Sequence, residues 1–260
     1  MSHQLRLYAH RGASLRCPEN SLEAFRQGLK EGANALEMDV HATADGHFVV
    51  THDPDGERLM ADRRRIRDLP LAEVKRWRHC GADTSIPTLE EVLENFDGVP
   101  MSIDLKPDDP DLVPPFLECL TRSGGESTVT IASFHHRVLK RVHLMGWKGR
   151  TALSRLEIAA LRFAPLSVAR RLVRGHSAQI PTTAGPVRLD RSTFLKRCRR
   201  LDLRIDYWVV NDPFEARALL QQGATGLMTD DPALIAPVMR EFTNEGNEAV
   251  GKPGAGGRSK

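Results

Sequence analysis

ALEMDVHATADGHFVVTHDP, residues 35–54, combines a strand pattern with a turn signal, and the rest of the chain can be arranged around it. Polar and apolar side chains alternate along residues 35–41. Successive side chains of a strand point to opposite faces of its sheet, so the pattern predicts one acidic face and one apolar face. The acidic face carries Glu37, Asp39 and His41, and the apolar face carries Leu36, Met38 and Val40.

A tight hairpin is predicted directly after this strand. Asp45-Gly46 is a strong hairpin signal, because a type I′ turn needs two residues that tolerate positive φ. With these residues as the turn, Ala44 pairs with His47, and Asp39 lies opposite His52 at about 5 Å. Local geometry alone would then bring two carboxylates and an imidazole together. The alternative is a solvated hairpin with polar outer side chains.

Repetition of strand and helix patterns along the chain predicts a (β/α)8 TIM barrel. Almost every predicted strand is followed by a helix, and only the hairpin interrupts the alternation. A doubly wound open sheet is the alternative, but no Gly-rich dinucleotide fingerprint opens it. The predicted strands begin at Leu5, Ala35, Met101, Thr128, Arg150, Ala178, Leu203 and Thr225. The predicted helices cover residues 22–31, 89–96, 110–120, 136–145, 165–174, 192–200 and 214–222, and a last helix ends near Phe242.

The length of 260 residues suits one large α/β domain, which we expect over residues 1–243. A polar, Arg-rich insertion of about residues 55–87 follows the hairpin of the second strand. Residues 244–260 are Gly-rich and polar, and they are predicted to form a disordered C-terminal tail.

Composition excludes several classes of protein. The net charge is +3 with acidic and basic residues interspersed, so a nucleic-acid partner is not expected. No apolar run is long enough to span a membrane, and the N-terminus lacks the apolar region of a secretory signal. The four cysteines have no metal-binding spacing, as in reduced cytoplasmic enzymes. A cytoplasmic location is therefore expected.

Polar residues gather where the predicted strands end, which is the active-site face of such a barrel. His10 and Arg11 follow the first strand, and Asp104 and Lys106 end the third. Three converging acids, Glu37, Asp39 and Asp104, repel one another unless a positive charge lies between them. Oxygen ligands favour Mg²⁺ or Ca²⁺ in that place. The alternative is a salt-bridge network in which Arg11 and Lys106 neutralise the acids without a metal.

The remaining side chains at this face fit phosphodiester cleavage. Arg11 and Lys106 are suited to holding a phosphate. His10 and His52 are suited to moving protons at neutral pH, one as base and one as acid. Trp208, late on the seventh strand, is either a buried core residue or a wall for the alcohol group of the substrate. His41 shares the Glu37 face, but it is expected nearer the turn, away from His52, and is given no role.

Several blocks of this sequence together resemble the glycerophosphodiester phosphodiesterase family, and the match runs from about Leu7 to Ile235. The resemblance implies a (β/α)8 barrel with a small insertion, and a phosphoric diester hydrolase that releases glycerol 3-phosphate and an alcohol with the help of a divalent cation. It implies that His10 and His52 form the acid–base pair. Glu37, Asp39 and Asp104 would bind the metal, Arg11 and Lys106 the phosphate, and Glu19 would orient Arg11. The blocks are AHRGASLRCPENSLEAF, ALEMDV, DGHFVVTHDP, IPTLEEVL, MSIDLK, IASF, YWVVNDP and GLMTDDP.

One departure from the family pattern concerns the metal. The family usually has Glu where this chain has Asp104, and the shorter side chain draws the carboxylate back by roughly 1.5 Å. The ligand could then act through water, or the site could prefer the larger Ca²⁺.

Two other functions remain open at this stage. The first is a lysophospholipase D that cleaves the same bond in a lipid, because LRFAPLSVARRLVR (residues 161–174) is apolar and basic. Such a segment is more often an outer barrel helix with solvated arginines, so peripheral membrane contact is not expected. The second is a non-catalytic phosphate-binding barrel, which the presence of both histidines disfavours. A small soluble glycerophosphodiester is the expected substrate.

Overall fold

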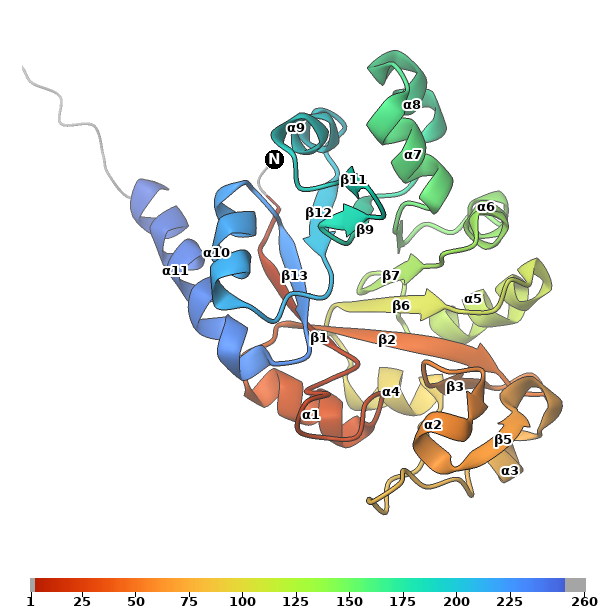
Figure 1. Cartoon of the computed structure of the whole chain (residues 1–260). Helices are drawn as coiled ribbons and strands as arrows, with labels where there is room; N and C mark the ends of the chain where they lie inside the picture. Colours follow the sequence, from red (N-terminus) through yellow and green to blue (C-terminus); the bar gives the residue numbers. More distant parts are fainter. Residues whose placement is uncertain (1–2, 251–260) are drawn as a thin grey trace, which may run out of the picture.

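A computed structural model describes residues 3–250, with side chains described for residues 3–243. Eight parallel strands follow one another around a nearly closed barrel (Figure 1) in the order β8-β7-β6-β2-β1-β13-β12-β9. A parallel bridge between Ala152 and Ser177 joins the two ends of this order. The predicted (β/α)8 barrel is confirmed. The strands are β1 (Arg6–His10), β2 (Ala35–Ala42), β6 (Met101–Leu105), β7 (Val129–Ala132), β8 (Arg150–Thr151), β9 (Ser177–Ile180), β12 (Arg204–Tyr207) and β13 (Gly226–Thr229).

The helices pack around the strands, and the main hydrophobic core lies between the two layers. Capping residues begin the helices where the sequence predicts: Ser21 accepts a hydrogen bond from the Ala24 amide, and Thr88 and Glu91 form a capping box. The outer helices that match the prediction are α1 (Leu22–Lys30), α4 (Leu89–Asn95), α5 (Val113–Arg122), α6 (His136–Leu144), α9 (Ser192–Arg200) and α10 (Pro213–Gln221). A short 3-10 turn, Pro110–Leu112, leads into α5.

The hairpin after β2 has a different register from the predicted one. Val40 pairs with Val50 of β3 (Phe48–Val50), so Asp39 falls opposite Thr51 and not opposite His52. The Thr43 amide donates to the His47 carbonyl at 2.8 Å, which leaves a three-residue loop, 44–46. Within this loop only Gly46 has positive φ, whereas a type I′ turn needs two such residues.

Two elements near the top of Figure 1 were not predicted. The helix α7 (Arg155–Phe163) precedes α8 (Leu166–Leu172), where the sequence analysis has a single helix beginning at Pro165. Ser154 and Glu157 form a capping box at the start of α7. A serine followed three residues later by a glutamate is the sequence signal that indicates this helix start. A hairpin, β10 (Thr183–Ala184) with β11 (Val187–Arg188), follows β9.

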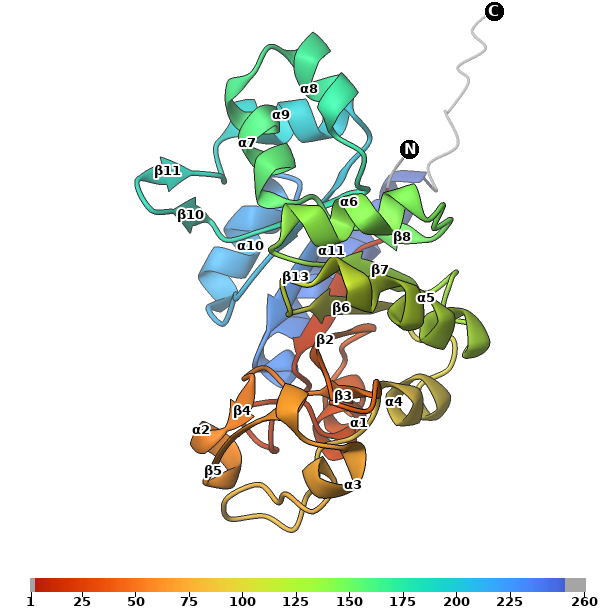
Figure 2. The same ribbon diagram turned by 90° about the vertical axis from the view of Figure 1, so that its right-hand side faces the viewer.

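Residues 55–87 form the insertion, which has its own small sheet and apolar cluster. The sheet pairs β4 (Asp55–Gly56) with β5 (Asp62–Arg65), and the short helices are α2 (Glu57–Met60), Ile66–Asp68 and α3 (Leu71–Val74). Ile66, Leu69, Val74, Trp77 and Ile86 pack with Val49 of β3. In Figure 2 the insertion and the β10–β11 hairpin project from the same end of the barrel, below and above the strands.

The last helix, α11 (Pro232–Val250), runs past the end predicted near Phe242. The rest of the predicted tail, residues 251–260, lies outside the described residues, and the division into domain and tail stays a prediction. Within residues 3–250, no helix is long and apolar enough to cross a membrane. The four cysteines, Cys17, Cys80, Cys119 and Cys198, are all free.

Candidate active site

A cleft of about 650 Å³ opens at the carboxyl ends of the barrel strands. One half is lined by charged side chains and the other by apolar ones. The charged half contains all but two of the candidate site residues: His10, Arg11, Glu37, Asp39, His52, Asp104 and Lys106. Of the other two, Trp208 lies in the apolar half, and Glu19 does not line the cleft but contacts Arg11. The structure therefore brings the predicted residues together.

Three carboxylates come from two neighbouring strands at the floor of the charged half. Glu37 and Asp39 share one face of β2, and Asp104 of β6 is paired in register with Asp39. Glu37 is 7% exposed, Asp39 1% and Asp104 6%. Burial, aided by the negative charge of Asp39, raises the pKa of Glu37 to about 7. Burial also raises the pKa of Asp104.

Two cations lie against these acids. Lys106 Nζ is 2.7 Å from Asp39 Oδ1 and 2.8 Å from Asp104 Oδ2, and Arg11 Nε is 3.1 Å from Asp39 Oδ2. Burial alone would raise the pKa of Asp39, but Lys106 and Arg11 outweigh it and lower that pKa. Part of the predicted salt-bridge network is thus present, centred on Asp39.

His10 is held by a carboxylate that directly follows the last strand, β13. Its Nδ1 is 2.7 Å from Asp230 Oδ1, and its Nε2 is 3.8 Å from Glu37 Oε2. Burial would lower the pKa of His10, but Glu37 and Asp230 raise it overall. Burial would likewise raise the pKa of Asp230, but hydrogen bonds from His10 and Asn211 bring it down to about 2. An ionised Asp230 can only accept, so His10 donates from Nδ1, and its Nε2 faces Glu37.

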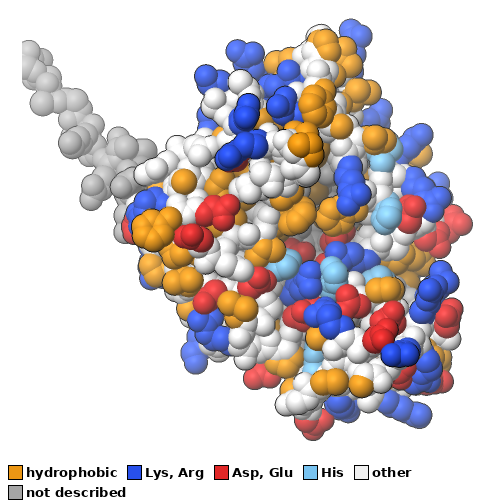
Figure 3. Space-filling model, viewed as in Figure 1, with side chains coloured by type: hydrophobic (Ala, Val, Ile, Leu, Met, Phe, Trp, Pro, Cys, Tyr) orange, Lys and Arg blue, Asp and Glu red, His pale blue; other side chains and the backbone are white. Residues whose placement is uncertain are grey.

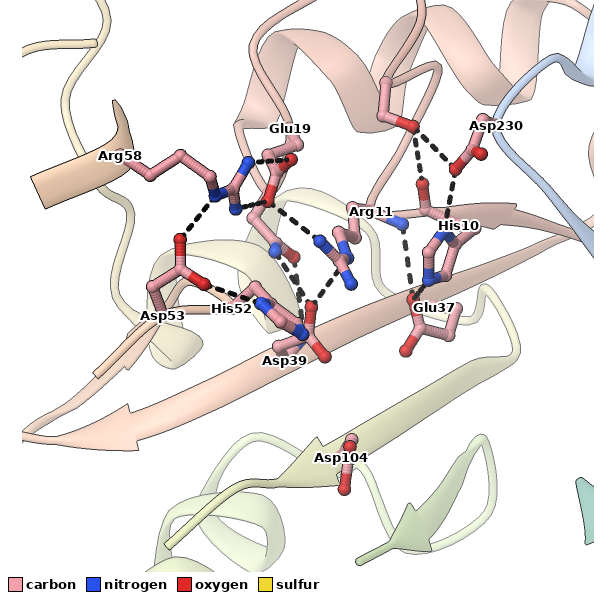
Figure 4. Close-up of polar contacts among 12 residues, drawn as sticks. His10, Arg11, Glu19, Glu37, Asp39, His52, Asp53, Arg58, Asp104 and Asp230 are labelled. Atoms are coloured by element: carbon pink, nitrogen blue, oxygen red, sulfur yellow. Dashed lines mark hydrogen bonds and ion pairs between the residues drawn. The ribbon is translucent and has the colours of Figure 1, made fainter. Parts of the chain in front are cut away.

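His52 is held in the same way by its neighbour in sequence (Figure 4). Its Nδ1 is 2.8 Å from Asp53 Oδ1, and Arg58 of the insertion donates from Nε to Asp53 Oδ2 at 2.6 Å. Arg58 also donates twice to Glu19, at 2.7 and 3.0 Å. Glu19 in turn accepts from Arg11 at 3.1 Å. A continuous chain of hydrogen bonds therefore links the insertion to His52 and to Arg11.

Asp53, Arg58 and His41 support the site, and the sequence pattern gives none of them a role. Asp53 directly follows His52, and Arg58 lies five residues further on in the predicted insertion, so proximity in sequence was the only available signal. The expectation that His41 stays away from His52 is wrong, because His41 Nε2 lies 3.1 Å from the His52 carbonyl oxygen. His41 therefore fixes the main chain that carries His52.

The acidic floor fits a divalent cation by its donor chemistry. Asp104 Oδ1 is buried and has no hydrogen-bond partner. Burial, and after it the negative charge of Asp39, raises the pKa of Glu37, and the nearby basic side chains offset this only in part. Among the described residues, however, no three acidic, histidine or cysteine side chains are grouped closely enough to hold an ion as they stand. Lys106 lies between Asp39 and Asp104 instead.

Aromatic and aliphatic side chains form the other half of the cleft. Trp208 is half-buried and meets Phe134 edge to face, with ring centroids 6.0 Å apart. The Arg155 guanidinium lies 4.7 Å from the centre of the Phe134 ring. Further apolar side chains come from α7, β9 and the β10–β11 hairpin: Ile158, Phe163, Ile180 and Val187. Trp208 thus lines the cleft, and its contact with the alcohol group of a substrate stays a prediction.

Comparisons with known proteins agree on one family. A family model described as the glycerophosphoryl diester phosphodiesterase family matches residues 10–234. A probable glycerophosphodiester phosphodiesterase 2 of Mycobacterium tuberculosis is 30% identical and aligns over 89% of each chain. Lysophospholipase D GDPD1 of Homo sapiens is 24% identical over 90% of this chain and 86% of its own. A solved Oleispira antarctica phosphodiesterase in complex with the product sn-glycerol-3-phosphate has a TM-score of 0.76 and 21% identity, and the alignment covers 90% of this chain and 96% of that one.

Proposed function

Because this chain belongs to the glycerophosphoryl diester phosphodiesterase family, and is therefore a phosphoric diester hydrolase acting on glycerophosphodiesters, we propose how its residues perform that reaction. The enzyme uses His10 and His52 as an acid–base pair and a divalent cation at the acidic floor. One observation carries this proposal: each imidazole has its Nδ1 held by an acidic side chain, which leaves Nε2 to exchange a proton. The products are glycerol 3-phosphate and an alcohol.

The two histidines divide the proton transfers between them. A neutral ring with hydrogen on Nδ1 presents a basic Nε2, and a protonated ring presents an acidic Nε2–H. One histidine takes the proton from the attacking oxygen, and the other gives a proton to the leaving alcohol. If the attacking oxygen belongs to water, glycerol 3-phosphate forms directly. If it belongs to the glycerol 2-hydroxyl, a cyclic phosphate forms first, and water then opens it to glycerol 3-phosphate. Each transfer typically contributes on the order of 10²–10⁴ in rate. Figure 4 shows the two rings on either side of Arg11, which with Lys106 orients the phosphate.

A cation at the floor would be held by Glu37, Asp39 and Asp104, whose oxygens suit Mg²⁺ or Ca²⁺. When bound, it would neutralise charge on the phosphoryl oxygens. Glu19 and Arg58 keep Arg11 and His52 in place around it. We expect the enzyme to work in the cytoplasm, where the four unpaired cysteines would stay reduced.

Lysophospholipase D activity is the second candidate, and the apolar half of the cleft favours it. Trp208, Phe134 and Ile158 offer an apolar wall next to the charged half, as the alkyl chain of a lysolipid would need. A human relative carries that activity in its name. A small headgroup alcohol would leave most of this wall unused.

The test is the release of glycerol 3-phosphate from glycerophosphocholine by the purified chain. We expect turnover of this soluble diester, and lysophosphatidylcholine in a parallel assay separates the two candidates by their kcat/KM. Turnover of lysolipid alone would replace the first candidate by the second. Phosphate binding without turnover of either substrate would instead support the hypothesis of a non-catalytic phosphate-binding barrel.

Replacing Arg58 by alanine should lower kcat by about 10-fold with little change in KM, because a slightly misplaced His52 transfers its proton poorly. Lysine should not rescue the loss, since a single ammonium cannot reproduce the paired contacts of the guanidinium with Glu19 and Asp53. Steady-state kinetics of both variants check this expectation.

Arg64 provides the matched control for Arg58. It lies in the same insertion, pairs with the two carboxylates of Asp62 and Glu73, and is 54% exposed against 48% for Arg58. Arg64→Ala should leave kcat unchanged. Equal losses in both variants would mean that Arg58 acts only through the stability of the insertion.

A further inference from the structure

The α7–α8 face presents four large apolar side chains to solvent. These are Leu156 (60% exposed), Phe163 (67%), Val168 (43%) and Leu172 (52%), which we call the α7–α8 face. On the same helices, Leu161 and Ala169 are fully buried in the core. The two helices therefore carry more apolar surface than their packing against the barrel buries.

The same segment is strongly basic. Residues 155–174 contain five arginines and one carboxylate, a formal charge of +4, whereas the entire chain carries only +3. The carboxylate, Glu157, is buried and accepts hydrogen bonds from the main chain of Ser154 and Arg174, so it does not offset the arginines at the surface. The neighbouring helix α9 adds Lys196, Arg197, Arg199 and Arg200 and no acid.

The face is continuous with the active-site cleft. Phe163 belongs to both, since it lines the cleft and is also largely exposed, and Arg162 and Ile158 of the same helix line the cleft as well. Figure 3 shows hydrophobic and basic side chains together on the upper part of the molecule, where Figure 1 places α7 and α8. The apolar half of the cleft therefore opens beside this surface.

We propose that the α7–α8 face docks on an anionic lipid surface. Its apolar side chains enter the boundary between headgroups and acyl chains, and its arginines lie against the anionic headgroups, as in interfacial amphipathic helices. This differs from the expectation drawn from residues 161–174 alone, because solvated arginines on an outer helix do not account for four exposed apolar neighbours.

The positive charge of the α7–α8 face favours a lipid surface over a second copy of the chain as its partner. A two-fold interface through the face would bring the same arginines of both copies together, and like charges across an interface repel. An anionic bilayer offers the opposite charge together with an apolar layer for Phe163 and Leu172. A lipid surface therefore satisfies both features of the face at once.

The experiment is co-sedimentation of the full chain with vesicles. Vesicles of equal parts phosphatidylglycerol and phosphatidylcholine should bind at least about ten-fold more protein than pure phosphatidylcholine vesicles, and high salt should reduce the binding. Two double variants, Arg170→Glu with Arg171→Glu and Val168→Ser with Leu172→Ser, should each lose most of it. None of these four residues lines the cleft, so hydrolysis of glycerophosphocholine should stay unchanged.

Matched controls carry the same changes elsewhere. Arg63→Glu with Arg67→Glu alters two exposed arginines of the insertion, and Leu144→Ser alters an apolar side chain that is 68% exposed on α6. Both should bind anionic vesicles like the wild type. The proposal would be overturned by equal binding to neutral vesicles or by full binding of the face variants. It would also be overturned if sedimentation velocity showed a wild-type dimer that becomes a monomer in Leu172→Ser. The soluble assay reports the catalytic site separately, so failure of docking and failure of the proposed reaction are distinguishable.

Discussion

Replacing His10 or His52 by alanine is expected to lower turnover of glycerophosphocholine by at least about 100-fold, the usual contribution of one positioned acid or base. Each ring is tied to its own carboxylate, Asp230 or Asp53, and neither ring is within reach of the other's partner in the described contacts. One histidine therefore cannot substitute for the other. Initial rates with saturating substrate, at matched protein concentration, measure the effect.

The histidine variants need a control for general damage to the fold. His47 is exposed directly after the hairpin loop and outside the cleft, so His47→Ala should keep wild-type turnover. Thermal unfolding followed by circular dichroism should show that all three variants fold. If His10→Ala or His52→Ala keeps near-native activity in a folded protein, the acid–base role of that residue is wrong.

Removal of divalent cations is expected to have an effect of similar size. Treatment with EDTA should lower turnover by about 100-fold or more, and Mg²⁺ or Ca²⁺ should restore it, because a cation supplies several kcal/mol of charge stabilisation to a phosphoryl group. The ion that restores more activity shows what the shorter Asp104 does to the site. Asp104→Glu, which extends the carboxylate by one methylene, should shift the preference toward Mg²⁺.

A binding measurement separates the cation from other effects of the acids. Titration calorimetry with Mg²⁺ or Ca²⁺ should show one site in the wild type and a loss of most affinity in Glu37→Gln. Glu73→Gln, a change of an exposed glutamate in the insertion, should bind the ion normally. Full activity after exhaustive chelation would instead favour the alternative in which Lys106 and Arg11 alone balance Asp39 and Asp104.

Much of the fold and of the candidate site can be predicted from the amino-acid sequence, because the relevant signals are local. Alternation along residues 35–41 places Glu37 and Asp39 on one face, and the predicted helices 22–31 and 89–96 correspond to α1 and α4. The repeated strand–helix pattern then predicted the barrel, and a barrel places residues at strand ends on one face. His10 and Asp104 were therefore assigned to the cleft without any knowledge of tertiary contacts.

The register of the hairpin and the contacts of His52 depend instead on tertiary contacts, which no local pattern predicts. The Asp45 carboxylate accepts a hydrogen bond from the Leu71 amide, 26 residues away, and the loop containing it has three residues where local preference predicts two. Asp230 reaches His10 across 220 residues, and Arg58 joins His52 to Glu19 across the barrel rim. Propensity and spacing act over a few residues. Hydrogen bonds between distant segments depend on how the barrel closes, and they set the orientation of the histidines.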